Sequence, residues 1–346
     1  MNNFYILLVA FLAAFILTPL NIHMSRHWGL VDVPKDNRRM HEKPVATVGG
    51  VSIFLAFLIT VLLFLKINTR IIFALVGSGI MVITGIVDDK RNLRPRTKLL
   101  LQIAAALVAV IGGFEIGILS NPFVPGQVFH LGIFGPILSI LWIVGISNAL
   151  NFVDGMDGLC AGISAISALT FYFALQEGGA VALMSLALGG ACLGFLPYNF
   201  NPAKIFMGDT GALFLGYMLA LISIDGVLKS VATMSLLLPL FILALPLVDT
   251  IFAILRRTVN KRGIMSADKG HLHHRLVSRG FSVRKTVLIL YGMSILFSIL
   301  GLILSHLQPS IALVIAGVTF VIIFMLGFLF GLFRKESDTK HQGGIH

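Results

Sequence analysis

Long apolar runs recur along the whole chain and constrain its fold more than any other feature. A helix needs about 20 mostly apolar residues to cross the hydrocarbon core of a bilayer. Only 12% of the 346 residues are charged, against about 25% in a soluble domain. We therefore predict an all-α, polytopic membrane protein of about eleven transmembrane helices. The expected spans are 3–20, 48–65, 70–87, 98–114, 131–148, 159–175, 180–197, 211–226, 231–252, 285–305 and 310–333.

The chain is expected to form one membrane domain over residues 1–333, followed by a basic tail at 334–346. It shows no repeat of fixed period and no linker long enough for a second domain. The first segment lacks the basic n-region of a cleavable signal peptide. The two cysteines, Cys160 and Cys192, lie inside apolar segments and indicate neither a disulfide nor a metal framework. Small residues are expected to let the helices pack closely, among them Gly77, Gly79, Gly189 and Gly190.

Basic residues predict the orientation. With the N-terminus outside, the inner segments are the expected loops 21–47, 88–97, 149–158, 198–210 and 253–284, together with the tail. All but three of the 26 Lys and Arg then fall in or beside these segments, the exceptions being Lys66, Arg70 and Lys229. Because basic loops stay in the cytoplasm, we predict a cytoplasmic C-terminus. The net charge of +11 therefore needs no nucleic acid to explain it, and a phosphate-bearing partner at the membrane surface fits better.

Acidic residues and histidines gather on the same side, which the positive-inside rule does not explain. Of the 15 Asp and Glu, only Glu115, Glu177 and Asp225 lie elsewhere, and of the 10 His only His130 and His306 do. This excess of acids and imidazoles predicts a functional site on the inner face.

The first polar motif, GIVDDKRNLRPRTK, follows the third apolar run. Asp88 and Asp89 are adjacent there, and an Asp at a helix C-terminus opposes the helix dipole. We interpret the pair as carboxylates that hold Mg²⁺ or act on a proton; the alternative is a helix end with ordinary flanking charges. Cations that could bind phosphates follow at Lys90, Arg91, Arg94, Arg96 and Lys98.

The second motif, NALNFVDGMDGL at 148–159, carries four oxygen-bearing side chains and no Lys or Arg. Their spacing of three places them on one side if the turn is helical, and oxygen ligands suit Mg²⁺. The alternative is capping and turn formation, for which Asp-Gly pairs are well suited. The four residues are Asn148, Asn151, Asp154 and Asp157.

The third motif is YNFNPAKIFMGDTGALF at 198–214. Asp209 or Thr210 could cap the next helix, and free amides at that helix start would favour a phosphate. For Asp209, capping and a binding role are equally supported. Phe206 lies three residues earlier, where a base could stack on it, but packing is the better interpretation from the residues alone.

The fourth motif is the loop RRTVNKRGIMSADKGHLHHRL at 256–276. Its histidines could suggest zinc, but no Cys accompanies them and flanking cations would repel a dication. We interpret the group His271, His273, His274 and Arg275 as binding sugar-phosphate oxygens; the alternative is a basic loop touching lipid headgroups. Asp249, inside the ninth apolar run, is as compatible with an internal helix contact as with a functional role.

Together, VDDK, NFVDGMDG, FMGDTG and HLHHR resemble, in order and type, the polyprenyl-phosphate N-acetylhexosamine-1-phosphate transferase family, which includes WecA, TagO and the translocase MraY. The likeness covers nearly the whole chain, so the membrane domain is expected to be catalytic. The resemblance implies transfer of a sugar-1-phosphate from a UDP-sugar to undecaprenyl phosphate, with release of UMP. It also implies Mg²⁺ as cofactor, with Mn²⁺ as the alternative ion.

The resemblance further implies roles for individual residues. Asn151 and Asp209 match the metal ligands, and Asp88 and Asp89 match the catalytic aspartate pair. Phe206 matches a uracil-stacking aromatic, which reverses the preference for packing. The remaining substrate-binding matches are Asp154, Gly155, Met156, Asp157, Asn199, His271, His273, His274 and Arg275.

Some positions depart from the family pattern. Lys43, in HEKPVATVGG, is a substrate-binding candidate only, because its motif spacing differs by one from that of the translocase branch. The form HLHHR matches the WecA and TagO branch and favours UDP-N-acetylglucosamine over the muramoyl-pentapeptide donor of the translocase. The product would begin a cell-envelope glycan of the teichoic acid or O-antigen type in a bacterial plasma membrane. Oligomeric state, including a homodimer, is left open, and a transporter is the alternative from another class.

Overall fold

The computed structural model describes residues 3–27, 31–32, 45–121, 124, 127–175, 179–229, 237–260 and 270–329. Helices dominate this part of the chain, so the predicted all-α class is confirmed. The helices are α1 (Phe4–His27), α2 (Gly50–Phe64), α3 (Thr69–Arg91), α4 (Pro95–Ile111), α5 (Phe134–Val153), α6 (Leu159–Ala174), α7 (Gly179–Asn199), α8 (Gly208–Lys229), α9 (Leu237–Ile242), α10 (Ala244–Val259), α11 (Leu272–Ser278), α12 (Val283–Ser305) and α13 (Pro309–Leu329).

Two small antiparallel sheets accompany the helices. β1 (Val31–Asp32) pairs with β2 (Val45–Ala46), and β3 (Ile118–Ser120) pairs with β4 (Val128–His130). In the second pair Leu119 lies opposite Phe129. Neither sheet adds a layer to the helical body.

Six helices in the described part of the chain are long and apolar enough to cross a membrane: α1, α3, α5, α7, α12 and α13. Two more, α2 and α6, are apolar but shorter. Many large apolar side chains of α1, α12 and α13 are exposed, as expected of helices that face lipid. The chain is therefore a multi-pass membrane protein.

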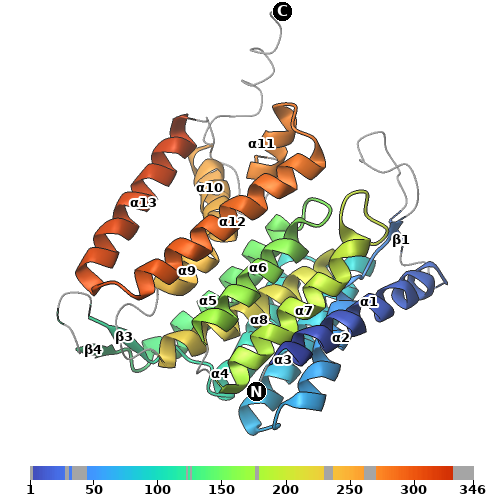
Figure 1. Ribbon diagram of the computed structural model, residues 1–346, viewed down its shortest axis with the longest axis horizontal. Helices are drawn as coiled ribbons and strands as arrows, with labels where there is room; N and C mark the ends of the chain where they lie inside the picture. The colour runs from blue at the N-terminus through green and yellow to red at the C-terminus, as the bar shows by residue number, and fades with distance from the viewer. Residues whose placement is uncertain are drawn as a thin grey trace, which may run out of the picture.

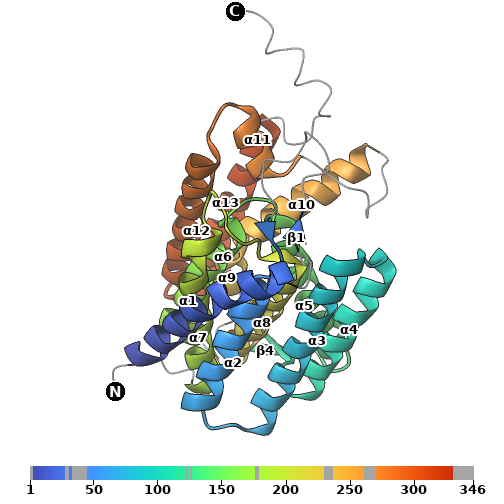
Figure 2. The ribbon, with the colours of Figure 1, turned by 90° about the vertical axis from the view of Figure 1, so that its right-hand side faces the viewer.

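The core of the fold is α8. Every residue from Thr210 to Asp225 is buried, and α3, α5 and α2 pack around the helix. In Figure 1, α12 and α13 lie on one side of this centre and the blue helices α1 and α2 on the other, and Figure 2 shows α3 and α4 as neighbours. The first turn of α8 is thus held from several directions.

Close helix contacts depend on glycine at several positions. A Cβ atom at Gly190 of α7 would lie 2.4 Å from the carbonyl oxygen of Leu7 in α1, and one at Gly77 would overlap the Tyr217 hydroxyl. The expectation for Gly79 is wrong, since within the described residues nothing lies within 4 Å of its Cβ position.

The ninth expected span, 231–252, is divided between α9 and α10. Pro246 lies in the first turn of α10 and has no N–H to give the carbonyl four residues earlier. That carbonyl, of Ile242, instead accepts a hydrogen bond of 3.3 Å from the Ser167 hydroxyl in α6. A side chain from a neighbouring helix therefore satisfies the backbone group that the proline leaves free.

An ion pair joins α3 to α8 at the end far from the polar motifs. Arg70, near the start of α3, places a guanidinium nitrogen 2.8 Å from a carboxylate oxygen of Asp225, which is fully buried. The same guanidinium lies 4.4 Å above the Phe114 ring. A buried carboxylate requires such a partner, because an unpaired charge in this environment is costly.

Candidate active site

Four helix ends bring residues of three polar motifs together. Asp88 and Asp89 lie in the last turn of α3, and Lys98 lies in the first turn of α4. Asn151 is near the end of α5, and Asp209 is in the first turn of α8. Asn151 and Asp209, which were expected in loops, thus stand on helices, which hold functional side chains more rigidly than loops.

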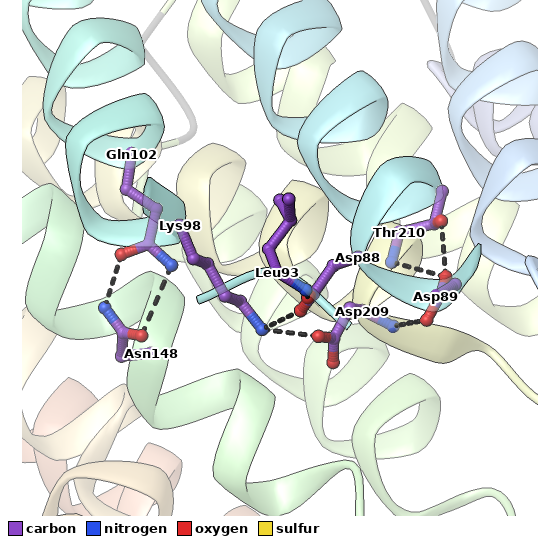
Figure 3. A network of polar contacts seen from close by, with 8 residues as sticks. All are labelled: Asp88, Asp89, Leu93, Lys98, Gln102, Asn148, Asp209 and Thr210. Carbon is purple, nitrogen blue, oxygen red and sulfur yellow. Dashed lines mark hydrogen bonds and ion pairs between the residues drawn. The ribbon is translucent and has the colours of Figure 1, made fainter. Parts of the chain in front are cut away.

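The Lys98 ammonium lies at the centre of this cluster (Figure 3). Its Nζ is 2.8 Å from Oδ2 of Asp88 and forms a second ion pair with Oδ2 of Asp209. With the Asn151 amide oxygen facing the ammonium, that oxygen is 3.0 Å from Nζ, and the Asn151 amide nitrogen donates to Asp209 Oδ1 at 2.7 Å. Oxygens from three helices therefore converge on one positive charge.

Sequence reasoning did not distinguish Lys98 from the other four cations of its motif. The structure does, because Lys90, Arg91, Arg94 and Arg96 are exposed while the Lys98 side chain is only 14% exposed. The direction of the Lys98 side chain depends on how α4 packs beside α5, and the local sequence does not encode this packing.

Asp89 has a different environment from its neighbour. Its Oδ1 accepts a hydrogen bond from the backbone N of Asp209 at 2.8 Å. Its Oδ2 accepts from the backbone N of Thr210 at 3.1 Å and from the Thr210 hydroxyl at 2.6 Å. Asp89 therefore caps the start of α8, where free amides need acceptors.

The backbone of Gly208 makes this capping contact possible. Its φ is +72°, and a Cβ atom there would lie 2.6 Å from Oδ2 of Asp89. Gly85, one turn before Asp89 on α3, likewise allows close approach, since its Cβ would lie 2.2 Å from the Thr210 Cα. Two glycines thus bring the end of α3 against the start of α8.

The donor set around Lys98 fits a hard divalent cation. Asp88, Asp209 and Asn151 offer carboxylate and amide oxygens, and they already surround an ammonium group. Among the described residues no three His, Cys, Asp or Glu side chains form a full protein cage for a metal. Mg²⁺ does not require one, since it usually takes one or two carboxylates and completes its shell with water and substrate phosphates.

A pair of amides braces this cluster from the side. The Asn148 amide nitrogen donates to Gln102 Oε1 at 2.8 Å, and the Gln102 amide nitrogen donates back at 3.3 Å. Gln102 lies one turn after Lys98 (Figure 3). Asn148 lies one turn before Asn151. The pair fixes α4 against α5 and so sets the distance between Lys98 and Asn151.

Two residues that were expected to bind substrate make internal contacts here. Oδ2 of Asp157 accepts from the Asn201 amide at 3.0 Å and from the Ala203 backbone N at 3.1 Å. Asn199 is buried, accepts from the Gly158 backbone N at 3.1 Å and donates to the Ile205 carbonyl at 2.9 Å. Both join the turn after α5 to the loop before α8.

Asp154 lies at the end of α5, close to the other carboxylates. Burial raises its pKa well above its usual value, and the nearby charges of Asp209, Asp89 and Asp157 raise that pKa further. The carboxyl therefore keeps its proton to a higher pH than an ordinary Asp does, and in that form it can donate as well as accept a hydrogen bond. Met156, two residues on, is buried in the apolar core.

The histidine segment docks against the end of α5. The His271 ring stacks on Phe152, with centroids 5.8 Å apart, and lies parallel to the His273 ring at 5.7 Å. Nε2 of His273 lies against Gly155, where a Cβ would come within 2.5 Å of it. The histidine segment of the fourth motif thus contacts the second motif, residues 148–159.

Within this segment, burial lowers the pKa of His273 to about 4, with a smaller contribution from the neighbouring His274. His273 is therefore neutral near pH 7. The His274 ring lies 4.3 Å from the His273 ring, and Nε of Arg275 donates to the Gly270 carbonyl at 3.0 Å.

Phe206 is half-buried and is held through its backbone. Its N donates to the Ala46 carbonyl, and its carbonyl accepts from the Gly49 N, both at 2.9 Å. The segment before α8 is thereby joined to the segment before α2. Lys43, the remaining substrate-binding candidate, lies outside the described residues.

Comparison with known proteins supports the family resemblance. The profile described as Glycosyl transferase family 4 matches residues 71–227. A Bacillus subtilis protein named probable undecaprenyl-phosphate N-acetylglucosaminyl 1-phosphate transferase is 40% identical over 95% of this chain and 92% of its own length. A Thermotoga maritima protein named undecaprenyl-phosphate alpha-N-acetylglucosaminyl 1-phosphate transferase is 34% identical over 84% of this chain and 87% of its own length.

A relative from the translocase branch is also similar. The phospho-N-acetylmuramoyl-pentapeptide-transferase of Oceanobacillus iheyensis is 34% identical over 85% of this chain and 95% of its own length. These matches extend along nearly the whole sequence, as the order of the four motifs predicts. The chain is therefore a membrane-embedded transferase that belongs to glycosyl transferase family 4, in the group of polyprenyl-phosphate N-acetylhexosamine-1-phosphate transferases.

Proposed function

We propose that this chain transfers N-acetylglucosamine-1-phosphate from UDP-N-acetylglucosamine to undecaprenyl phosphate and releases UMP. The names of the Bacillus subtilis and Thermotoga maritima relatives support this donor and acceptor. The observation that carries the proposal is the convergence of Asp88, Asp209 and Asn151 on one cation at the helix ends. The product would be the first lipid-linked sugar of an envelope glycan, of the teichoic acid or O-antigen type.

The site is proposed to face the cytoplasm of a bacterial plasma membrane, with about eleven spans and the N-terminus outside. The distribution of Lys and Arg supports this orientation. Cysteine labelling tests it, because the native Cys160 and Cys192 are buried. In intact cells, an impermeant maleimide should label Lys66→Cys and should not label Arg91→Cys; the reverse result would invert the topology.

Of the two adjacent aspartates, Asp88 is proposed to take part in the reaction. Its Oδ2 faces Lys98, and its Oδ1 accepts from the backbone N of Leu93 at 2.6 Å. Both oxygens of Asp89, in contrast, are bound by the start of α8, away from Lys98. Asp89 then acts as a positioning residue that places Asp209. Lys98 offsets part of the negative charge of Asp88 and Asp209 at the point where two polyanions must meet.

Asn151 and Asp209 are proposed to hold Mg²⁺, with Asp88 close by. When bound, the ion would neutralise pyrophosphate charge and polarise the phosphoryl oxygen. The proximity of the two side chains supports this assignment, since the Asn151 amide nitrogen donates to Oδ1 of Asp209 at 2.7 Å.

The donor is proposed to lie over the turn after α5. Phe206 would stack on the uracil, and Asp154 and Gly155 would contact the nucleotide. Met156, which is buried in the apolar core, would support the turn from beneath. His271, His273, His274 and Arg275 would contact the sugar and pyrophosphate, which their docking against the end of α5 supports. Asp157 and Asn199 would support this turn from behind, since they hold it to the loop before α8.

The lipid phosphate is proposed to attack the sugar-bearing phosphorus directly. A phosphate monoester with a second pKa of about 6 is already mostly dianionic at pH 7, so it needs no general base. Incubation with UDP-N-acetylglucosamine labelled in the sugar, without lipid acceptor, tests this. Label that stays on the protein through denaturation, and is absent from Asp88→Ala, would instead identify a covalent intermediate.

The decisive assay is UMP release by the purified chain with UDP-N-acetylglucosamine, undecaprenyl phosphate and Mg²⁺. Release that requires all three supports the proposal, and Asp88→Ala and Asp209→Ala should lower kcat by at least about 100-fold. UDP-N-acetylmuramoyl-pentapeptide is the parallel donor, because the Oceanobacillus iheyensis relative is also similar. Turnover of that donor alone would place the chain with the translocases.

A further inference from the structure

Asp249 is a buried acid on α10 for which the proposed reaction assigns no role. The residue is 5% exposed and lies among apolar neighbours on a helix that leads toward the site. Its two carboxylate oxygens are both engaged. Oδ2 lies 2.9 Å from Nδ1 of His271, and Oδ1 accepts from the Leu272 backbone N at 2.9 Å.

The contact with His271 determines which ring nitrogen is available. An ionised carboxylate only accepts hydrogen bonds, so Nδ1 must carry the proton that joins it to Asp249. The other nitrogen, Nε2, is then the ring atom left for a different partner. A carboxylate behind an imidazole fixes both the tautomer and the orientation of the ring.

The ring itself lies at the site. His271 precedes α11, is 5% exposed and stacks on Phe152, the residue after Asn151. The ring is also parallel to that of His273, whose Nε2 lies against Gly155. The Asp249–His271 contact therefore links α10 to the turn after α5, the helix that carries Asn151.

We propose that Asp249 is a positioning residue that holds Nδ1 of His271 protonated and so presents Nε2 of that ring to a phosphate or sugar oxygen of the bound donor. The claim that Nε2 meets a phosphate or sugar oxygen of the donor rests on the proposed function. The claim that Nδ1 carries the proton does not depend on any substrate.

The substitution Asp249→Asn separates this role from simple helix bracing. The Leu272 N–H can only donate, so it orients the new amide with its oxygen toward Leu272 and its NH₂ toward His271. Helix bracing and side-chain volume are kept, but Nδ1 now faces a donor and the proton must move to Nε2. A purely structural role predicts little change, whereas a positioning role predicts the wrong tautomer.

The tautomer can be read without turnover. Full-length protein with ¹⁵N-labelled histidine at pH 8 should show a ring signal with protonated Nδ1 that disappears in His271→Gln. In Asp249→Asn the same ring should carry its proton on Nε2. The matched control is Asp225→Asn, which makes the same change in another buried carboxylate and should leave the His271 signal as in wild type. A wild-type ring protonated on Nε2 would overturn the proposal.

Kinetics then test the consequence for the reaction. Asp249→Asn should lower kcat by about 10- to 100-fold, out of proportion to any change in thermal unfolding, and Asp249→Glu should recover part of the loss. In a His271→Gln background, Asp249→Asn should add less than about twofold, because the two residues act together. Equal losses in both backgrounds would overturn the positioning role. Absence of all activity with the expected tautomer would count against the proposed function and leave the Asp249–His271 pair supported.

Discussion

Asp89 and Thr210 are joined by two hydrogen bonds to one carboxylate oxygen, from the Thr210 backbone N at 3.1 Å and from its hydroxyl at 2.6 Å. At the opposite end of the same two helices, Arg70 pairs with Asp225 at 2.8 Å. The helices α3 and α8 are thus joined by polar contacts at both ends. The distance between Asp88 and Asp209, which belong to these helices, depends on the contact between Asp89 and Thr210.

Replacing each aspartate of the pair should have a different effect. Asp89→Ala removes three hydrogen bonds to the start of α8, and we expect it to lower the free energy of unfolding by about 2 kcal/mol. Asp88→Ala removes one backbone hydrogen bond, from the Leu93 N, and leaves Lys98 paired with Asp209, so it should cost less stability than Asp89→Ala and abolish UMP release. Thermal unfolding in detergent and the transfer assay, measured on the same preparations, compare the two. Equal unfolding temperatures for both variants would contradict the division of roles.

Mg²⁺ should stabilise the protein in the absence of substrate. A ligand that binds only the folded state at 100 times its Kd adds about 2.7 kcal/mol, so the unfolding midpoint should rise when Mg²⁺ replaces EDTA. Asn151→Ala and Asp209→Asn should each reduce this rise. Asn121→Ala, at the β3–β4 hairpin, is the control and should keep it. A rise that survives in Asp209→Asn would place the ion elsewhere.

Gly155 should not tolerate a side chain. In Gly155→Ala the new Cβ would lie 2.5 Å from Nε2 of His273, which forces the histidine segment away from the turn at a cost of about 1–3 kcal/mol. The KM for the donor should rise. Gly145→Ala is the matched control, because within the described residues nothing lies within 4 Å of its Cβ; it should be neutral or slightly stabilising.

His273 should make stability depend on pH. Its pKa is lowered to about 4 in the folded protein from 6.5, so the unfolded chain binds its proton first as pH falls. Folding is therefore unaffected above about pH 6.5 and loses stability progressively down to about pH 4, by at most about 3 kcal/mol. The unfolding midpoint of wild type should fall between pH 7 and pH 5. His273→Gln should show a shallower fall, and an identical slope would contradict this assignment.

Ser167 should stabilise the break between α9 and α10. Ser167→Ala leaves the Ile242 carbonyl without its hydroxyl donor, and an unsatisfied buried carbonyl costs about 1–3 kcal/mol. Ser78→Ala is the control, since the Ser78 hydroxyl bonds only within its own helix, to the Leu75 carbonyl. Equal unfolding midpoints for the two variants would show that another group satisfies Ile242.

Much of the helical fold was predictable because each helix carries its own apolar signal. In the described part of the chain, each expected stretch overlaps a helix, and the division between α9 and α10 has a local cause in Pro246 that could have been read from the run 231–252. The strands near Val45 and Leu119 were not expected, since such short pairs carry almost no pattern of their own.

The candidate site was predictable in its residue types but not in its contacts. Motif order identified Asp88, Asn151 and Asp209 before their proximity was known. The choice of Lys98 among five cations depends on the rotation of α4, and the capping role of Asp89 depends on where α8 begins. Asp249 looked equally structural and functional because its partner, His271, is 22 residues away along the chain.

The contacts that join α3 to α8, Asp89 to Thr210 at one end and Arg70 to Asp225 at the other, affect how the protein responds to its membrane. A bilayer whose thickness does not match a protein's apolar band can tilt the helices of that protein. Because Asp89 and Arg70 fasten α3 to both ends of a helix that is buried from Thr210 to Asp225, the two tilt together. Lipid composition can thus change the inclination of the pair while Asp88 and Asp209 keep their spacing, so that the geometry of the site is insulated from the thickness of the bilayer around it.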